Sequence, residues 1–443
     1  MPFFEFLSDN VLRGKCETNH FHIVVADDIN TQDLPSLPQK TLGTFMHEYL
    51  HYIQFNDTLF GISYGMVFNN YYATCRQFFS ENDTLEIPLK IQELNPVIRA
   101  NVEKYKKLKG TVKDFGIKID RIEISPLAIE EAKRNKTGVF VKGYDGEGRS
   151  IDFEFGYLCI IEGMAHQFQT FFDPTVEHPE IPYNVVEIIC RSNYPDLLID
   201  AKMLFSICMC SLIYTNPSTG FFEVLEILRH NPQFNGRDLY QYMIKGSTVT
   251  SDGVKYTIED IFVDMITNYE GNIKATIQAE LNYYSKVFKN CTQEIKSGES
   301  LLLNLLYLSD ISSKKSVDEI LNFYGLPYIE FNNLTMMPGK QKNKTSFLDL
   351  ARLIGFELVI KRFIPQIDIG KYPKYDPKCP MYHKCKNTLY KEGIEDHQRA
   401  QMSEECENKQ WQKQEICLMT MALKWCNIHG KEVTQNELPM KYR

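Results

Sequence analysis

Apolar side chains recur every three or four positions through residues 39–55, which is the spacing of one face of an α-helix. The series consists of Leu42, Phe45, Met46, Leu50 and Ile53. No proline interrupts the run and Asn56-Asp57 is a suitable stop, so the pattern predicts a helix over these residues. Just upstream, the apolar run 21–26 is bounded by Asp27 and Asp28 and predicts a short buried strand.

A second apolar run covers residues 155–168 and predicts another helix. The segments 138–142 and 150–155 alternate apolar and polar residues on either side of the polar turn 144–148. This arrangement predicts a β-hairpin that leads into the second helix. An extended peptide could add as a strand to the edge of such a hairpin, and a purely structural hairpin is the alternative.

The rest of the chain has a mainly helical pattern. Helices are predicted at 59–80, 126–132, 183–191, 196–214, 219–230, 236–244, 257–289, 299–309, 315–324 and 346–363. Residues 325–345 are rich in glycine, proline and asparagine and predict a loop region. The sequence therefore predicts an α+β fold that is mainly helical, with a small sheet or hairpin.

The first predicted helix carries the pentapeptide His47-Glu48-Tyr49-Leu50-His51. Because positions i and i+4 lie on one face of a helix, both imidazoles can reach one metal ion, which this motif predicts to be zinc. Glu48 is then placed as the general base that takes a proton from a zinc-bound water. Two structural histidines on a packed helix are the alternative interpretation.

A zinc site of this type needs a third protein ligand. The extended metzincin motif would place a glycine and a third histidine soon after His51, but residues 52–57 contain neither. Glu162 is the best candidate, because a carboxylate in so apolar a helix is costly unless a metal compensates it. Gly163 and Ala165 are small, as close packing against the first helix requires. A surface glutamate on an amphipathic helix is the alternative.

The two motifs together resemble the gluzincin branch of zinc metallopeptidases, such as bacterial collagenase-like enzymes, whose third ligand is the Glu of a Glu-Gly-x-Ala-type helix. The resemblance covers two short helices, through His47-Glu48-Tyr49, His51-Tyr52 and Glu162-Gly163-x-Ala165. It implies a zincin-like core in which His47, His51 and Glu162 bind Zn²⁺ and Glu48 is the general base. Two features depart from the family: His166 replaces a frequent acidic residue, and the segment between His51 and Glu162 is much longer than in compact members.

His166 lies four residues after Glu162 and therefore on the same helical face. We expect it to orient the Glu162 carboxylate or to stabilise an oxyanion, with a packed or solvent-facing histidine as the alternative. Peptide hydrolysis also needs a donor to the oxyanion, often a tyrosine or histidine. Tyr183 and Tyr194 lie downstream as weaker candidates among 25 tyrosines.

The composition narrows the class of protein. Apolar residues make up 43% and charged residues 24% of the chain, as in ordinary globular proteins, and the net charge of −8 argues against a general nucleic-acid binder. No apolar run is long enough to cross a bilayer, and the N-terminus lacks a secretory signal, so we expect no membrane association. Isolated cysteines in apolar helices, such as Cys159 and Cys208, suit reduced thiols in the cytoplasm.

Five of the 12 cysteines lie in the tail from Cys379 onward. A structural zinc or iron–sulfur site built from Cys379, Cys385, Cys406 and Cys417 is one interpretation, with His383 or Cys426 as substitute ligands. Unliganded thiols in a small helical appendage are the alternative.

These patterns predict a catalytic core at 1–175, a helical subdomain at 176–370 and a Cys-rich tail at 371–443. The predicted activity is zinc-dependent hydrolysis of peptide bonds in a polypeptide substrate, since long helical additions suit recognition of a protein. Two alternatives remain open at this point. One is a narrowly targeted toxin or defence protease that cleaves a single host protein, and the other is a protein-interaction module with a vestigial metal site.

Overall fold

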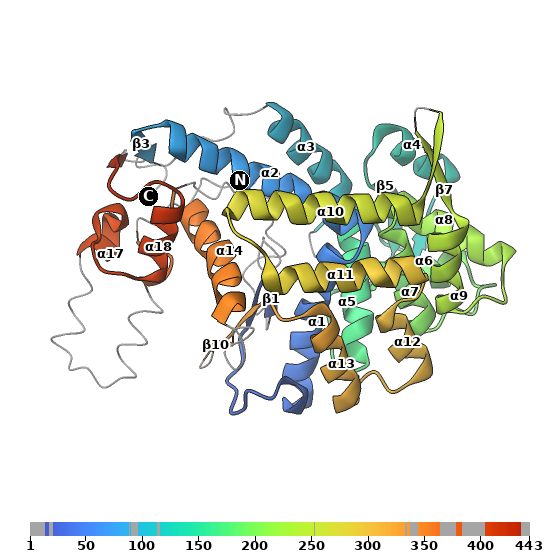
Figure 1. Ribbon diagram of the computed structural model, residues 1–443. Coiled ribbons are helices and arrows are strands. Elements are labelled where there is room, and N and C mark those ends of the chain that lie inside the picture. The colour runs from blue at the N-terminus through green and yellow to red at the C-terminus, as the bar shows by residue number, and fades with distance from the viewer. Residues whose placement is uncertain are drawn as a thin grey trace.

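The computed structural model describes residues 14–16, 21–87, 89, 96–112, 116–251, 253–332, 335–336, 344–363, 378–382 and 404–435. This part of the chain is α+β and mainly helical, with its strands in four small sheets (Figure 1). The predicted fold class is confirmed at that level. No helix within these ranges is long and apolar enough to cross a membrane.

Helices account for most of the architecture. The α-helices are α1 (Gln39–Asn56), α2 (Leu59–Glu81), α3 (Pro96–Lys109), α4 (Pro126–Asn135), α5 (Tyr157–Thr170), α6 (Val185–Asn193), α7 (Ala201–Ser211), α8 (Pro217–His230), α9 (Gly236–Gln241), α10 (Ile258–Ile277), α11 (Asn282–Ser297), α12 (Leu301–Leu308), α13 (Lys314–Tyr324), α14 (Lys344–Phe363), α17 (Glu404–Asn408) and α18 (Leu418–Trp425). Shorter helical turns are η1 (Leu34–Ser36), η3 (Glu180–Asn184), η4 (Tyr242–Gly246) and η5 (Gln410–Gln412).

The strands are short; most pair with a neighbour in the sequence, but β2 with β9 and β3 with β11 pair over long sequence distances. They are β1 (Gly14–Cys16), β2 (His22–Val25), β3 (Thr84–Ile87), β4 (Arg121–Glu123), β5 (Val139–Tyr144), β6 (Ser150–Phe155), β7 (Thr248–Ser251), β8 (Val254–Thr257), β9 (Tyr328–Phe331), β10 (Thr335–Met336) and β11 (Glu432–Gln435). One sheet has the order β1-β2-β9-β10, with β2 and β9 parallel and Ile23 opposite Ile329. The other sheets are β4-β5-β6, β7-β8 and the parallel pair β3-β11.

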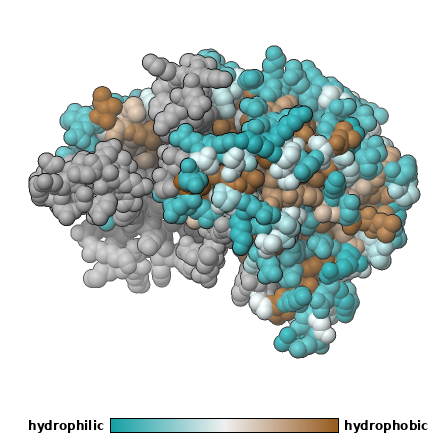
Figure 2. All heavy atoms as spheres, turned by 90° about the horizontal axis from the view of Figure 1, so that it is seen from below, coloured by the Kyte–Doolittle hydropathy of each residue, from teal (hydrophilic) through white to brown (hydrophobic). Residues whose placement is uncertain are grey.

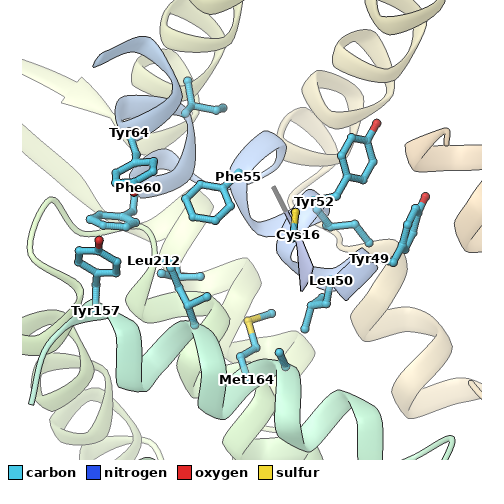
Figure 3. Close-up of a cluster of buried hydrophobic side chains, with 14 of the residues drawn as sticks. Cys16, Tyr49, Leu50, Tyr52, Phe55, Phe60, Tyr64, Tyr157, Met164 and Leu212 are labelled. Carbon is cyan, nitrogen blue, oxygen red and sulfur yellow. The ribbon is translucent and has the colours of Figure 1, made fainter. Parts of the chain in front are cut away.

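Helix α1 is buried on all sides. Every residue from Thr41 to Asn56 is buried, and the helix contacts α5, α2, β1 and β2. Figure 3 shows Leu50 close to Met164 between α1 and α5, with Tyr49 and Tyr52 on the opposite side of α1. The predicted helix is confirmed, but its polar positions also point into the protein and must find partners there.

Tyr49 and Tyr52 attach α1 to the end of α13. Their hydroxyls donate hydrogen bonds to the carbonyl oxygens of Gly325 and Tyr324, the second at 2.7 Å. Because these carbonyls lie at a helix C-terminus, where they have no partner within the helix, each bond satisfies two buried polar groups. The side of α1 that faces away from α5 is thus held in a defined orientation.

Two sequence predictions need correction. The single helix predicted at 257–289 is two helices, because α10 ends where Gln278 adopts a left-handed conformation (φ 49°) and α11 starts at Asn282. The loop predicted at 325–345 contains β9, whose partner β2 lies near the start of the chain. A four-residue strand completed by such remote pairing has almost no local signal in the sequence.

The predicted hairpin is confirmed as β5 and β6.

Hydrophobic side chains are mostly inside the molecule. Figure 2 shows a face whose described surface is largely hydrophilic, with hydrophobic residues in small groups. The buried apolar residues form one continuous cluster that includes α1, α2, α5, α7 and α8. The helices predicted from apolar periodicity therefore pack around a shared core, with α1 and α5 inside it.

A pair of buried carboxyl groups lies at the C-terminal end of α1. Asp57 follows α1 directly, and Glu294 projects from α11, where it accepts hydrogen bonds from the Leu301 N–H and, at 3.0 Å, from the Tyr324 hydroxyl. Burial raises the pKa of both carboxyls, to about 7 for Glu294, and the nearby Glu294 charge raises that of Asp57 further. Among the described residues, the ionisable groups that face them are Cys291 and the tyrosines 240 and 324, none of them basic.

We predict that this pair makes the fold less stable as the pH rises. The ordinary pKa of Glu294 is 4.5, so between about pH 4 and pH 7 the unfolded chain releases a proton that the folded chain retains. Stability therefore falls through this window, by on the order of 3 kcal/mol for Glu294. Urea unfolding at pH 5 and pH 8 should show a smaller loss in Glu294→Gln than in the wild type.

Glu299→Gln is the matched control, because Glu299 is an exposed glutamate just after the same helix. It should retain the pH dependence of the wild type. An equal loss of stability in the wild type and Glu294→Gln between pH 5 and pH 8 would contradict the prediction.

Candidate metal centre

Helices α1 and α5 pack against each other and bring three predicted ligands together (Figure 1). The Nε2 atom of His47 lies 3.3 Å from Oε2 of Glu162, and Nε2 of His51 lies 3.5 Å from the same oxygen. One ligand atom from each residue lies within 4.8 Å of the other two. All three residues are buried, with exposed fractions of 5%, 5% and 2%. The long separation of His51 and Glu162 in the sequence therefore does not prevent the contact.

Burial and neighbouring charges have opposite effects on the pKa values of Glu162 and His51. Burial opposes ionisation of Glu162, but the adjacent charges and hydrogen bonds of His51 and His47 outweigh it and hold the pKa of the carboxyl well below its usual range. Burial lowers the pKa of His51, whereas the Glu162 charge raises it, with a net rise to about 9. The ionised form of the buried Glu162 carboxyl thus depends on the two histidines beside it.

The donor set suits a metal ion. Two imidazole nitrogens and one carboxylate oxygen are a ligand set common in catalytic zinc sites, where three protein ligands leave a position for water or substrate. In the part of the chain that the structure describes, this is the one group of histidine, cysteine and acidic side chains arranged to hold an ion. A divalent cation bound there would place positive charge directly beside the buried Glu162 carboxylate.

Glu48 lies beside this cluster and against strand β1. It is 7% exposed, and the backbone N–H of Cys16 donates a hydrogen bond to its carboxylate. A Cβ atom on Gly14 would lie only 2.7 Å from the Glu48 side chain, so the glycine permits the close approach of β1. Burial raises the pKa of Glu48, and the Glu162 charge adds to this effect while His47 and His51 oppose it. The strand in contact with Glu48 is thus β1.

His166 is buried near the site, where its ring faces that of another histidine. Its ring lies 5.2 Å from the ring of His178, and its Nδ1 atom has no hydrogen-bond partner among the described residues. Burial lowers the pKa of His166 to about 4, and the neighbouring His47 contributes to this shift. His166 is therefore neutral at physiological pH, and it contacts a third histidine at the edge of the site.

His178 and Tyr183 also line the site. The sequence did not point to His178, and it offered Tyr183 only as a weaker candidate for the oxyanion donor. The His178 ring stacks on Tyr183 at 4.3 Å and lies 5.5 Å from the ring of His47, while Tyr183 is 6.0 Å from His47. Burial lowers the pKa of His178 to about 3 and raises that of Tyr183, which the Glu162 and Glu48 charges raise further. His178 follows α5 in a non-periodic segment, so helix patterns could not identify it.

Gly163 explains how Tyr183 reaches the site. A Cβ atom at position 163 would lie 2.5 Å from Val186 and 3.4 Å from the carbonyl oxygen of Tyr183. The glycine therefore allows η3 and α6 to approach α5, which corrects the expectation that Gly163 serves the packing of α5 against α1. Tyr194, the other tyrosine considered, lies under the Arg229 guanidinium at 4.8 Å.

The Cys-rich tail forms no comparable cluster within its described part. The backbone N–H of Cys379 donates to the carbonyl oxygen of Cys406 at 2.9 Å, so these two residues lie close together. The cysteines that the structure describes there are not arranged as a metal-binding group. Cys385 and His383 lie outside the described residues. A metal site that also uses Cys417 stays a prediction.

Comparison of the chain with models of protein families, with curated proteins and with solved structures finds no match. The function must therefore be inferred from the geometry and chemistry of the site formed by α1, α5 and η3.

Proposed function

We propose that this chain is a zinc-dependent metallopeptidase of the gluzincin type that hydrolyses peptide bonds in a polypeptide substrate. The observation that carries the proposal is the meeting of His47, His51 and Glu162 within 4.8 Å, with Glu48 buried beside them on the same helix as the two histidines. This combination of three ligands and one adjacent carboxylate suits activation of a water molecule for attack on a carbonyl.

The proposed roles follow from the donor set and from the position of Glu48. When bound by His47, His51 and Glu162, zinc supplies a Lewis acid that polarises a carbonyl oxygen and acidifies water. Glu48 accepts the proton of the attacking water and then delivers it to the leaving amine nitrogen. Its raised pKa favours both steps, because a general acid–base group works best when its pKa approaches the working pH.

Tyr183 is the proposed donor to the developing oxyanion. Its raised pKa keeps the hydroxyl protonated, and its interaction with the Glu162 and Glu48 charges places it near both carboxylates. The stacked ring of His178 restricts the orientation of Tyr183, and the His178 ring nitrogen Nε2 is itself held 2.9 Å from Oε1 of Gln169. A donor fixed in this way stabilises charge in the transition state without reorganisation.

We infer a cytoplasmic location for the protein. Cys159, Cys190, Cys208 and Cys210 are all buried and form no disulfide, as is usual for proteins of reducing compartments. The helices that surround α1 and α5 provide a large framework, which suits a protein substrate.

The Glu48→Gln variant should separate metal binding from catalysis. Because Glu48 is not among the ligands, the variant should retain one equivalent of zinc, while hydrolysis of denatured protein substrates falls about 10²–10⁴-fold. Glu147→Gln, in the exposed β5–β6 turn, is the control and should retain full activity. Zinc content by mass spectrometry and release of peptides are the measurements. Undiminished hydrolysis by a zinc-loaded Glu48→Gln protein would refute the assigned role.

The Tyr183→Phe variant tests the oxyanion donor. Loss of the hydroxyl should lower kcat about 10–10³-fold and leave KM and zinc content nearly unchanged, because the bond forms mainly in the transition state. Tyr194→Phe is the matched control, since Tyr194 packs against Arg229. A change confined to KM would instead assign Tyr183 to substrate binding in the ground state.

A further inference from the structure

The side chain of Gln54 connects the two helices that carry the ligands. Gln54 lies on α1, three residues after His51, and only 1% of its surface is exposed. Its Oε1 atom is 2.9 Å from Nδ1 of His51. Its Nε2 atom donates a hydrogen bond of 3.1 Å to the carbonyl oxygen of Ile161, the residue directly before Glu162 on α5. One amide group therefore contacts a histidine ligand and the backbone next to the carboxylate ligand.

The chemistry of these contacts fixes the orientation of the Gln54 amide. A backbone carbonyl oxygen is only an acceptor, so the NH₂ group of Gln54 must face Ile161. Its oxygen must then face His51, and because that oxygen is only an acceptor, Nδ1 of His51 must carry the proton. The opposite ring nitrogen, Nε2, is the one directed toward Glu162 at 3.5 Å. In the neutral His51 ring, Gln54 thus selects the tautomer whose proton is on Nδ1, which leaves the electron pair of Nε2 for a metal ion.

The other histidine ligand has no such support. The Nδ1 atom of His47 is buried and has no hydrogen-bond partner in the described part of the chain, while its Nε2 atom lies 3.3 Å from Glu162. In this structure the ring of His47 is therefore oriented by packing and by its contact with Glu162. This asymmetry makes His51 the ligand that is oriented before a metal binds.

We propose that Gln54 is a positioning residue for the metal centre. It holds His51 in the metal-binding tautomer and fixes the position of Glu162 relative to α1 through the Ile161 carbonyl. The inference rests on the proposed zinc site. It adds a residue that touches neither the substrate nor the ion and acts through two of the three ligands.

A buried glutamine between two helices also stabilises the fold, so the experiment must separate stability from metal binding. Gln54→Met is close in shape and removes both hydrogen bonds, whereas Gln54→Glu retains an acceptor for the proton on His51. Asn56→Leu is the matched control, because it removes another buried α1 amide, one that donates to the Tyr52 carbonyl at 2.7 Å. Urea unfolding of the metal-free proteins measures the loss of stability in each variant.

Two properties of the full-length chain report on the metal centre itself: the zinc Kd from competition with a chromogenic chelator, and the visible spectrum of the Co²⁺-substituted protein. We expect Gln54→Met to weaken zinc binding about 10–100-fold and to change the Co²⁺ bands, as loss of a partner to a ligand does in other zinc proteins. Gln54→Glu should restore the affinity to within about threefold of the wild type. Asn56→Leu should lower stability while leaving both properties unchanged.

The outcomes distinguish this proposal from the function on which it rests. The wild type could bind zinc while Gln54→Met keeps the same zinc affinity and Co²⁺ spectrum. That result would overturn the role of Gln54 and leave the zinc site intact. An equal loss of affinity in Gln54→Met and Asn56→Leu would also overturn it, because the effect would then follow helix stability. Failure of the wild-type chain to bind zinc would overturn both proposals.

Discussion

Burial of the Glu162 carboxylate is the constraint on which the rest of the site depends. A carboxylate with 2% exposure is unfavourable unless positive charge lies next to it, and the described side chains of His47 and His51 lie within 3.5 Å of Glu162. Two neutral imidazoles cannot balance this charge alone. The charge must be balanced either by a proton on His51, whose pKa is raised, or by a divalent cation that the two histidines share with Glu162.

Buried carboxyl groups at two places along α1 have opposite pKa shifts. In the middle of α1, the histidines lower the pKa of the Glu162 carboxyl, whereas beyond its C-terminus Asp57 and Glu294 face no basic group among the described residues and their pKa values are raised. Burial is similar at both places, so the neighbouring charges decide which form is stable. Gln54 lies between them and contributes a neutral amide that orients His51 without adding charge.

The sequence predicted the part of the site that depends on local helix geometry. His47, Glu48 and His51 follow from a short contiguous motif, and Glu162 followed from the cost of a carboxylate in an apolar helix. His178 was missed because it lies in an irregular segment without periodicity, and β9 was missed because its pairing with β2 is remote in the sequence. The role of Gly163 also required the structure, since its close contact with Val186 arises only when α6 packs on α5.

The most direct test is anomalous diffraction at the zinc edge from crystals of the zinc-loaded chain. The expected result is one strong peak about 2.0–2.2 Å from Nε2 of His47, Nε2 of His51 and a carboxylate oxygen of Glu162. A peak elsewhere, or a zinc ion bound by the histidines with Glu162 turned away, would contradict the assignment of the metal centre.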